Sequence, residues 1–462
     1  MPSSIATIPC ASAALALSLL VLGCLDDSGY EEPPVTGSCP APALSCGAAC
    51  VDVSSDAENC GACGVVCEQG QYCSAGACLG ACPGGTSACD RSCRDLMSDT
   101  AHCGGCDRPC ATGFACSEGG CVAEAASEPP PSDLRIRVSG KQFNVCGRPI
   151  FMNGANTPWH RWNDFGGNYQ EAWWSDHYAA LRDTGVNSSR VWITCSGEVG
   201  IDISAAGVVL GATPAHWEHL DSFFAIAEQR QIYVMATLMS FDHFEDGAAA
   251  RWRAWIASDE NIDSYVDNYL IPFLERYRDN PYLWSIDLMN EPDWAYERGG
   301  ASLERLRAYF ARAARAIHAN SEVLVTVGMA SPKYNAPCVG CEPSITDRQL
   351  RTAVDDPGVY LDFYSPHYYD WVADVWGNTL HGRPADSAFV EDRPLMIGEH
   401  PARGTAGHTL GEDLEAAFSN GWQGTMPWTS NGVDRNGGFA EVSAAAASFR
   451  DAHPQLVAPS CP

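Results

Sequence analysis

Residues 134–462 alternate between short apolar runs and longer stretches with helical periodicity. The apolar runs have the length and continuity of strands buried on both faces of a parallel sheet. They lie at residues 150–155, 188–193, 232–238, 283–289, 323–328, 360–364, 395–398 and 424–428. Amphipathic patterns between them predict helices at 169–183, 215–229, 261–278, 302–319, 348–354, within 384–392, and at 410–420 and 440–452. Eight such strand–helix units predict a (β/α)8 TIM barrel.

A hairpin is predicted to precede this barrel. Its arms are residues 134–138 and 142–145, joined by a turn at Ser139-Gly140. Cys146 follows the hairpin directly, and Cys461 follows the last helix. The eighth helix should return to the face of the barrel where the hairpin lies. We therefore expect a Cys146–Cys461 disulfide, a small Cys338–Cys341 loop disulfide and an unpaired Cys195.

The first 133 residues have a different composition and contain an internal repeat. Eight cysteines, Cys39, Cys46, Cys50, Cys60, Cys63, Cys67, Cys73 and Cys78, recur with the same spacing 43 residues later as Cys82, Cys89, Cys93, Cys103, Cys106, Cys110, Cys116 and Cys121. Dense, even-numbered cysteine with few large apolar residues predicts a disulfide-rich module at 39–121. The Cys-x-x-Cys pairs also permit a metal interpretation. Residues 24–38 and 122–133, rich in acidic residues and proline, are predicted linkers.

The cysteine repeats resemble the Stig1-like repeats of secreted proteins, and the chain start favours export. Residues 11–22 are almost continuously apolar, which suits a signal peptide at 1–23 but is short for a membrane span. The segment ends in Val21-Leu22-Gly23-Cys24, which resembles a bacterial lipobox and implies lipidation of Cys24. The alternative is an ordinary signal peptide cut nearby. Membrane contact is expected only through this anchor, on a secreted or cell-envelope protein.

The net charge of the chain argues against one class of binding partner. The formal net charge is −29, from 57 acidic and 28 basic residues. Because nucleic-acid binding depends on clustered positive charge, we expect no nucleic-acid partner. We expect a monomer without a cofactor or metal. His216 and His219 share a predicted helix without a third ligand at a usual spacing, and we interpret them as packing residues.

Two glutamates follow predicted strands of the barrel. Glu291, in Asn290-Glu291-Pro292, ends the fourth strand, and Glu399, in Ile397-Gly398-Glu399, ends the seventh. A parallel barrel keeps its chemistry at the carboxyl ends of its strands. Two carboxylates across a barrel mouth suit glycosidic bond cleavage, in which one protonates the leaving oxygen and the other attacks the sugar.

Other polar and aromatic residues fall at strand ends in the same region. Arg190 lies on the second strand and can hold a carboxylate in its ionised form. Asn290 can hydrogen-bond a sugar 2-hydroxyl, and Trp428 offers a flat apolar face to a sugar ring. The remaining candidates are His243 after the third strand, His367 and Tyr369 after the sixth, and Trp159 in the aromatic-rich first loop.

Residues 134–462 resemble the clan-A glycoside hydrolases, most nearly the cellulase-like family 5. The resemblance implies that Glu291 is the acid/base and Glu399 the nucleophile. It implies that Arg190 braces Glu399, and that Asn290, His367, Tyr369, Trp428 and His243 complete the substrate site. Trp173, Trp174 and Trp371 are either further sugar platforms or helix-packing residues.

We therefore predict a secreted retaining endo-glycanase that cleaves β-1,4-linked polysaccharide by a two-glutamate double displacement. The sequence leaves cellulose, mannan and xylan backbones open. One alternative is an exo-acting β-glycosidase, since the barrel does not fix chain-end preference. Another is a catalytically inactive carbohydrate-binding lipoprotein, although both glutamates are present. A third makes the cysteine repeats a glycan- or wall-binding unit.

Overall fold

The computed structural model describes residues 44–46, 49–110, 114–117, 119–123, 134–245, 247–335, 344–387, 389, 392–459 and 461. The chain divides into two compact units, Met1–Ser127 and Glu128–Pro462. Cys24, Cys338 and Cys341, with the predicted leader and tether, lie outside the described residues. Among the described helices, none combines the length and apolar character needed to cross a membrane.

The first unit is built from short antiparallel hairpins held by disulfides. Its strands are β1 (Leu44–Cys46), β2 (Ala49–Val51), β3 (Tyr72–Ser74), β4 (Ala77–Leu79), β5 (Ser87–Cys89), β6 (Ser92–Arg94), β7 (Phe114–Ser117) and β8 (Gly120–Ala123). Strands β3 to β6 form one four-stranded sheet that combines strands from both repeats.

The disulfides follow the internal repeat. Cys46–Cys63 and Cys60–Cys73 of the first repeat correspond to Cys89–Cys106 and Cys103–Cys116 of the second, and Cys67–Cys78 and Cys82–Cys93 are also joined. Both Cys-x-x-Cys pairs are thus consumed by disulfides, which corrects the metal interpretation. Buried half-cystines such as Cys73 form the small core. Disulfides take the place of the apolar core that so short a segment cannot build.

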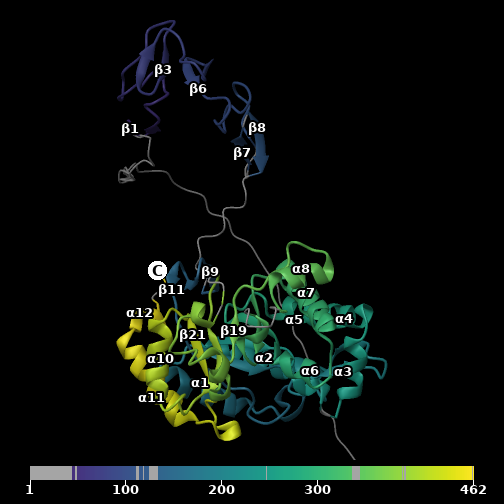
Figure 1. Ribbon diagram of the computed structural model, residues 1–462. Coiled ribbons are helices and arrows are strands. Elements are labelled where there is room, and N and C mark those ends of the chain that lie inside the picture. The colour runs from purple at the N-terminus through teal and green to yellow at the C-terminus, as the bar shows by residue number, and fades with distance from the viewer. Residues whose placement is uncertain are drawn as a thin grey trace, which may run out of the picture. The chain divides into compact units, whose positions relative to one another are not determined.

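The second unit is the predicted barrel, and this prediction is confirmed (Figure 1). Its strands are β12 (Met152–Asn156), β13 (Ser188–Trp192), β16 (Tyr233–Thr237), β17 (Leu283–Asn290), β18 (Leu324–Met329), β19 (Ser365–Pro366), β20 (Ile397–Pro401) and β21 (Gly424–Trp428). Successive barrel strands pair in parallel from β12 to β19, β20 pairs with β21, and β21 pairs with β12. Isolated parallel bridges at Tyr364–Leu395 and His367–Glu399 close the ring between β19 and β20.

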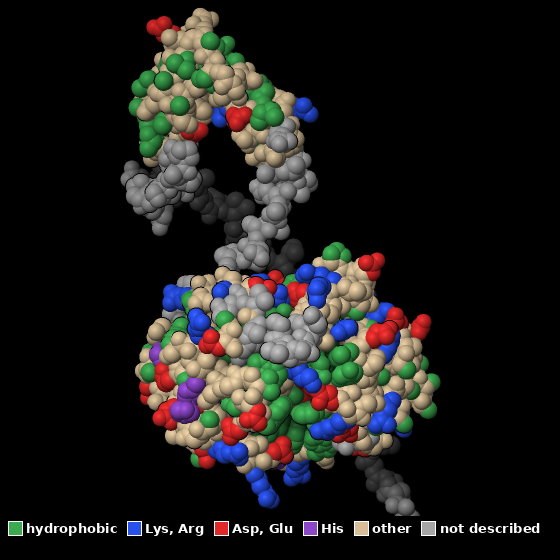
Figure 2. Space-filling view, viewed as in Figure 1, with side chains coloured by type: hydrophobic (Ala, Val, Ile, Leu, Met, Phe, Trp, Pro, Cys, Tyr) green, Lys and Arg blue, Asp and Glu red, His purple; other side chains and the backbone are tan. Residues whose placement is uncertain are grey.

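Helices surround the strands. They are α1 (Glu171–Asp183), α2 (Pro214–Arg230), α3 (Ala249–Ile256), α4 (Asp259–Tyr265), α5 (Ile271–Tyr277), α6 (Pro292–Glu297), α7 (Leu303–Asn320), α8 (Asp347–Val354), α9 (Ala373–Trp376), α10 (Leu410–Ser419), α11 (Phe439–Ala452) and α12 (Pro454–Val457). The residues at the start of α2 show how the sequence fixes where a helix begins. The Thr213 side chain accepts a hydrogen bond from the His216 N–H, and Pro214 occupies the first turn. On the visible face of this unit, acidic and basic side chains are interspersed (Figure 2).

Three expected elements differ from the structure. The single helix expected at 261–278 is α4 and α5 joined by a wider turn, Val266–Leu270, because Pro272 cannot donate a backbone hydrogen bond and crowds the preceding turn. The sixth strand, expected at 360–364, is only the pair Ser365–Pro366, and the helical segment expected within 384–392 is a single turn, Pro384–Ser387.

The barrel interior is apolar at its amino-terminal end. Met152, Met235, Trp284, Leu324, Phe363, Met396 and Met426 form one buried cluster there with residues of the hairpin. The hairpin strands are β9 (Ile136–Ser139) and β10 (Gln142–Val145), and β11 (Arg148–Pro149) pairs with β10. The Phe143 ring packs edge-on against Trp284 and Phe363, with centroids 5.2 Å apart in each pair. The hairpin therefore closes the amino-terminal end and leaves polar residues to the opposite mouth.

Cys146 forms a disulfide with Cys461, across a sequence separation of 315 residues. This is the pair expected from the hairpin and the last helix. Cys195 is buried and is not in a disulfide. The bond joins the two ends of the barrel unit beside the apolar cluster, where both half-cystines pack.

We predict that the double substitution Cys146→Ser/Cys461→Ser lowers the free energy of unfolding by about 2–5 kcal/mol, because the cross-link restricts a long loop in the unfolded chain. Urea denaturation followed by tryptophan fluorescence measures this change. The matched control is Cys195→Ser, which removes a thiol without opening a cross-link. Equal stability of the double variant and the wild-type protein would contradict the prediction.

Candidate active site

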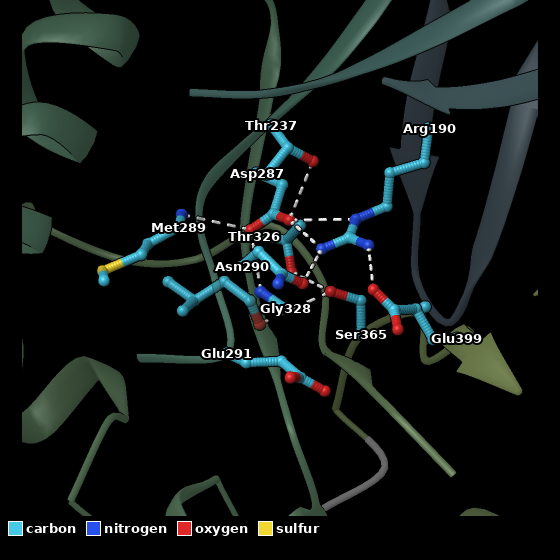
Figure 3. A network of polar contacts seen from close by, with 12 residues as sticks. Arg190, Thr237, Asp287, Met289, Asn290, Glu291, Thr326, Gly328, Ser365 and Glu399 are labelled. Carbon is cyan, nitrogen blue, oxygen red and sulfur yellow. Dashed lines mark hydrogen bonds and ion pairs between the residues drawn. The ribbon is translucent and has the colours of Figure 1, made fainter. Parts of the chain in front are cut away.

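A buried arginine organises the mouth of the barrel (Figure 3). Arg190, on β13, is fully buried. Its Nε and Nη2 donate to Asp287 Oδ2 at 3.0 and 2.7 Å, and its Nη1 donates to Glu399 Oε1 at 2.5 Å. Nη1 also donates to Asn156 Oδ1, and Nη2 to Asn290 Oδ1, at 3.1 and 2.9 Å. The guanidinium thus links four strands and fixes the direction of the Glu399 carboxylate.

Asp287 anchors the other side of this arginine, and the sequence analysis missed it. It is fully buried on β17 and accepts hydrogen bonds from Thr237 Oγ1 at 3.1 Å and from the Gly328 N–H at 2.8 Å. One signal was available in the sequence, because Asp287 is the sole charged residue in the apolar run 283–289. A charge inside a buried strand needs a partner, and here the partner is Arg190.

Gly328 leaves room for this network. A Cβ atom at Gly328 would lie 2.8 Å from Arg190 Nη2, 2.9 Å from Asp287 Oδ2 and 3.0 Å from His367 Nε2. A larger residue would have to displace charged groups that are held from several sides. The glycine on β18 is therefore required by the close approach of its neighbours.

Glu291 lies at the carboxyl end of β17 with an unusual backbone. Its φ is +48°, in the left-handed region that non-glycine residues rarely adopt, and its N–H donates to the Gly328 carbonyl at 2.7 Å. Its Oε2 accepts from Trp294 Nε1 at 2.9 Å, and its Oε1 lies 3.0 Å from His367 Nδ1. Burial raises the pKa of Glu291 to about 7. This carboxyl can therefore hold a proton near neutral pH and also release it.

Glu399, in the middle of β20, lies in a different environment. Its Oε1 accepts from Arg190 and its Oε2 from the Tyr369 hydroxyl, at 2.9 Å. Burial raises the pKa of Glu399, and the Arg190 charge opposes that rise. Charge-assisted hydrogen bonds favour the ionised form. Of the two glutamates, Glu399 is thus the one equipped to remain a carboxylate.

His367 lies between the two glutamates. Its Nδ1 is 3.0 Å from Glu291 Oε1 and 3.5 Å from Glu399 Oε2. Burial lowers the pKa of His367 to about 4, so the ring is neutral at neutral pH. One ligand atom from each of these three side chains lies within 4.8 Å of the others. The Arg190 guanidinium beside Glu399 would repel a cation there, so the arrangement suits proton transfer better than metal binding.

A cavity of about 530 Å³ opens above the two glutamates. Trp159, Trp162, Trp192 and Trp428 line its side formed by β12, β13 and β21, and these rings pack edge-on. Trp294, Tyr369 and Trp371 line the opposite side, and Asp434 and Asn436 add polar groups. Aromatic faces with a few polar groups suit a sugar chain.

The predicted site residues differ in whether they line the cavity. Glu291, Glu399, Asn290, Tyr369, Trp428 and Trp159 line the cavity. Arg190 and His367 are fully buried behind the carboxylates and contact those carboxylates instead of the cavity.

His243 was expected to contact the substrate, and its position in the structure shows that this prediction is wrong. His243 is fully buried, its Nε2 lies 3.0 Å from Thr194 Oγ1, and its ring packs edge-on against Trp252. Its neighbour Asp242 lines the cavity instead. The histidine supports the loop after β16 from below.

Two packing interpretations hold in the structure. His216 is buried between the Phe165 carbonyl and the Tyr269 hydroxyl, and His219 accepts from the Gly166 N–H. Trp174 is fully buried in the core, and Trp173 stacks between His160 and His177.

Trp294 was not singled out from the sequence, although it follows Glu291 by three positions at the start of a helix, where the two side chains can meet.

Comparisons with known proteins found matches for the cysteine repeats and for the barrel. Residues 34–81 match the model of the Stigma-specific STIG1-like protein family. A mannan endo-1,4-β-mannosidase of Mytilus edulis is 26% identical over 330 residues, which cover 65% of this chain and 89% of that protein. The corresponding protein of Cryptopygus antarcticus is 22% identical over 329 residues, covering 64% and 84%.

Solved structures agree on the fold. The endo-1,4-β-mannanase of Eisenia fetida aligns with a TM-score of 0.61 at 23% identity, covering 68% of this chain and 95% of that one. The mannanase of Mytilus edulis aligns with a TM-score of 0.61 at 22% identity, covering 69% and 96%. The barrel is similar to endo-1,4-β-mannanases. The prediction of a glycoside hydrolase is confirmed.

We predict that Trp294→Phe raises the pKa of Glu291 by about half a unit to one unit. The substitution removes the indole N–H that stabilises the ionised carboxylate, and a hydrogen bond to a charged group contributes about 1 kcal/mol more than one to a neutral group. Carbon-13 NMR titration of labelled glutamate carboxyls, assigned with Glu291→Gln, measures the shift. Trp371→Phe is the control, because that ring packs 5.9 Å from Trp294. A pKa that stays constant or falls would contradict the role given to Trp294.

Proposed function

We propose that the protein is a retaining endo-β-1,4-mannanase in which Glu399 is the nucleophile and Glu291 the acid/base. The observation that carries this proposal is the separation of the two carboxyls, whose nearest oxygens lie within 4.8 Å. Retaining glycosidases hold their carboxyls about 5–5.5 Å apart, whereas inverting enzymes need about 6.5–9.5 Å to admit a water molecule. The geometry supports direct attack on the sugar.

The reaction proceeds in two displacements. In the first, the Glu399 carboxylate attacks the anomeric carbon while the proton of Glu291 passes to the departing glycosidic oxygen, so that one C–O bond forms as another breaks. In the second, ionised Glu291 takes a proton from water, whose oxygen attacks the same carbon and releases Glu399. Each displacement inverts the anomeric centre, and the product retains its configuration.

The surrounding residues support this division of roles. Arg190 and Tyr369 hold Glu399 ionised and correctly oriented, while burial keeps Glu291 protonated at the start. Neutral His367 adjoins Glu291 without adding a positive charge that would drive off the proton. Asn290, fixed by Arg190, is positioned for a sugar 2-hydroxyl, an interaction that strengthens in the transition state.

Mannan is the proposed substrate because the similar proteins are named as endo-1,4-β-mannosidases. The aromatic residues on both sides of the cavity favour a polysaccharide that passes across it, over the exo-acting alternative. Both carboxyls and their partners are in place, which argues against a catalytically inactive binding protein.

We further propose that the protein acts outside the cell as a monomer without a nucleic-acid partner. The domain order is a leader at 1–23, a tether at 24–38, cysteine repeats at 39–121, a linker at 122–133 and the hydrolase at 134–462. The disulfides described in both units fit an oxidising compartment.

Lipidation of Cys24 is proposed as the means of anchoring, from the lipobox-like sequence that precedes it. In a bacterial host the wild-type protein should partition into the detergent phase, and Cys24→Ser should remain in the aqueous phase. Cys10→Ser controls for the loss of a thiol in the leader. If wild-type protein also remains aqueous, the anchor proposal is wrong and the chain is simply exported.

The proposed substrate is tested by reducing-sugar release from mannan, cellulose and xylan. Mannan should be the best substrate, and Glu291→Ala and Glu399→Ala should each lower its turnover by about 10³-fold or more, since each removes a group that acts in the transition state. Glu260→Ala, at an exposed position of α4 outside this cavity, is the control. Undiminished activity of either glutamate variant would exclude its assigned role.

Azide separates the two roles. On an activated aryl glycoside, Glu291→Ala should form the glycosyl-enzyme and stall, and azide should release a β-glycosyl azide. Glu399→Ala should give the inverted α-glycosyl azide, because azide then occupies the position of the missing carboxylate. The same anomer from both variants would contradict the assignment.

A further inference from the structure

An arginine lies over the indole that donates to Glu291. Trp294 Nε1 donates to Glu291 Oε2 at 2.9 Å. The guanidinium of Arg298 lies over the Trp294 ring, with its carbon 4.9 Å from the ring centroid, and the Arg298 N–H donates to the Trp294 carbonyl at 3.0 Å. Residues four positions apart share one face of a helix, so the side chains of Trp294 and Arg298 stay together.

The same guanidinium also contacts a second loop of the barrel mouth. Its carbon lies 5.3 Å from the centroid of the Phe241 ring, and its Nη1 donates to both carboxylate oxygens of Glu245 at 3.0 Å. Phe241 and Glu245 follow β16, whereas Trp294 belongs to α6 after β17. Phe241 and Trp294 both line the catalytic cavity. Arg298 therefore joins two loops at the wall of that cavity.

Arg298 can change the proton affinity of Glu291 in two ways. Burial raises the pKa of Glu291, and Trp294 and Arg298 both lower it. A hydrogen bond weakens steeply once its donor turns away from the acceptor, so contacts that fix the indole preserve its bond to Glu291. The guanidinium charge acts in the same direction, because a nearby positive charge favours the ionised carboxylate.

Arg298 differs in its exposure from the other cation that lowers the pKa of Glu291. Arg190 is fully buried and bonded to Asp287 and Glu399, whereas the side chain of Arg298 is 50% exposed. Arg298 can therefore be replaced without breaking the buried ion pairs of the barrel. The titratable groups around the two residues are, near Glu291, Arg190, Asp287, Asp293, His367, Tyr369 and Glu399, and, near Arg298, Glu245 and Glu297, the second of which also pairs with Lys333.

We infer that Arg298, held by Glu245, is a positioning residue that keeps the Trp294 indole directed at Glu291 and so sets the pH range over which this carboxyl delivers a proton. The inference rests on the proposed function, because it takes Glu291 as the acid/base, and it deepens that function by adding the residues that regulate the acid. An exposed ion pair contributes little by itself. The ring contacts carry the effect, because the face of an aromatic ring attracts a guanidinium.

The alkaline limb of the pH profile reports this effect. Glu291 must be protonated in the first displacement, since it donates to the departing oxygen, and kcat/KM therefore falls as the pH rises through the pKa of Glu291. A substitution that removes a group favouring the ionised carboxylate raises that pKa and moves the limb to higher pH. Simple structural damage instead lowers activity at every pH and leaves the limb in place.

Arg298→Gln and Arg298→Lys test the inference, with Arg315→Gln as the control. Arg298→Gln should move the limb upward by about half a unit, and Arg298→Lys by less, because lysine keeps the charge but not the planar stacking. Arg315 is an exposed residue of α7 outside the cavity, and its substitution should leave the limb unchanged. The measurements are kcat/KM on mannohexaose across the pH range and carbon-13 NMR titration of Glu291.

Glu245→Gln separates positioning from charge alone. Loss of the negative charge of Glu245 would by itself lower the pKa of Glu291. Because Glu245 holds Arg298 in place, the substitution should instead raise that pKa. The shift caused by Arg298→Gln should also be smaller in a Trp294→Phe background, where no indole N–H remains to be directed.

An unchanged limb in Arg298→Gln, or a pKa of Glu291 that does not rise in Glu245→Gln, would overturn the inference. A shift of full size in the Trp294→Phe background would also overturn it, because the effect would then come from charge alone. A wild-type protein inactive on every mannan would refute the proposed function, while the carbon-13 titration would still measure the effect of Arg298 on Glu291. An active wild-type protein whose Glu291 titration is unchanged by Arg298→Gln would refute only the positioning role.

Discussion

The site depends on one buried positive charge. Arg190 has no contact with solvent, and its guanidinium lies between Asp287 and Glu399. Desolvating such a group is expensive, and removing one partner of a buried ion pair costs about 3–5 kcal/mol, so the arrangement persists only because every side of the guanidinium is occupied. The negative charge of Asp287 balances the positive charge of Arg190 inside the barrel. The Nη1 group of Arg190 is then free of Asp287 and donates to Glu399.

The barrel supplies the geometry that this charge requires. Its amino-terminal half is filled by methionine and aromatic side chains and closed by the hairpin, so polar groups collect at the opposite mouth. Gly328 leaves the space in which Arg190, Asp287 and His367 approach each other. The ring closes between β19 and β20 through the His367–Glu399 bridge, so closure of the barrel also positions the Glu399 carboxyl.

The two glutamates differ because their surroundings differ. Glu399 receives hydrogen bonds from a guanidinium and a phenol, whereas Glu291 meets an indole N–H and a neutral imidazole. Identical side chains thus receive different hydrogen-bond donors although their nearest oxygens lie within 4.8 Å of each other. The strained backbone of Glu291 directs its carboxyl toward the same space. Trp294 donates a hydrogen bond to Glu291 and also lines a second, smaller cavity.

The sequence by itself determined the barrel, the disulfide-rich repeats, the two glutamates and the Arg190 brace. Buried parallel strands are continuous apolar runs, so polar residues at their ends are visible without coordinates. Only the tertiary structure decided that Asp287 balances Arg190, that His243 is buried away from the cavity, and that Trp294 contacts Glu291. Pro272 is present in the sequence, but the wider turn before it was not expected. The strand β19 has only two residues, and so short a segment has no apolar pattern from which to locate it. These features depend on distances between residues far apart in the chain, and sequence periodicity reports which face is buried, not what it is buried against.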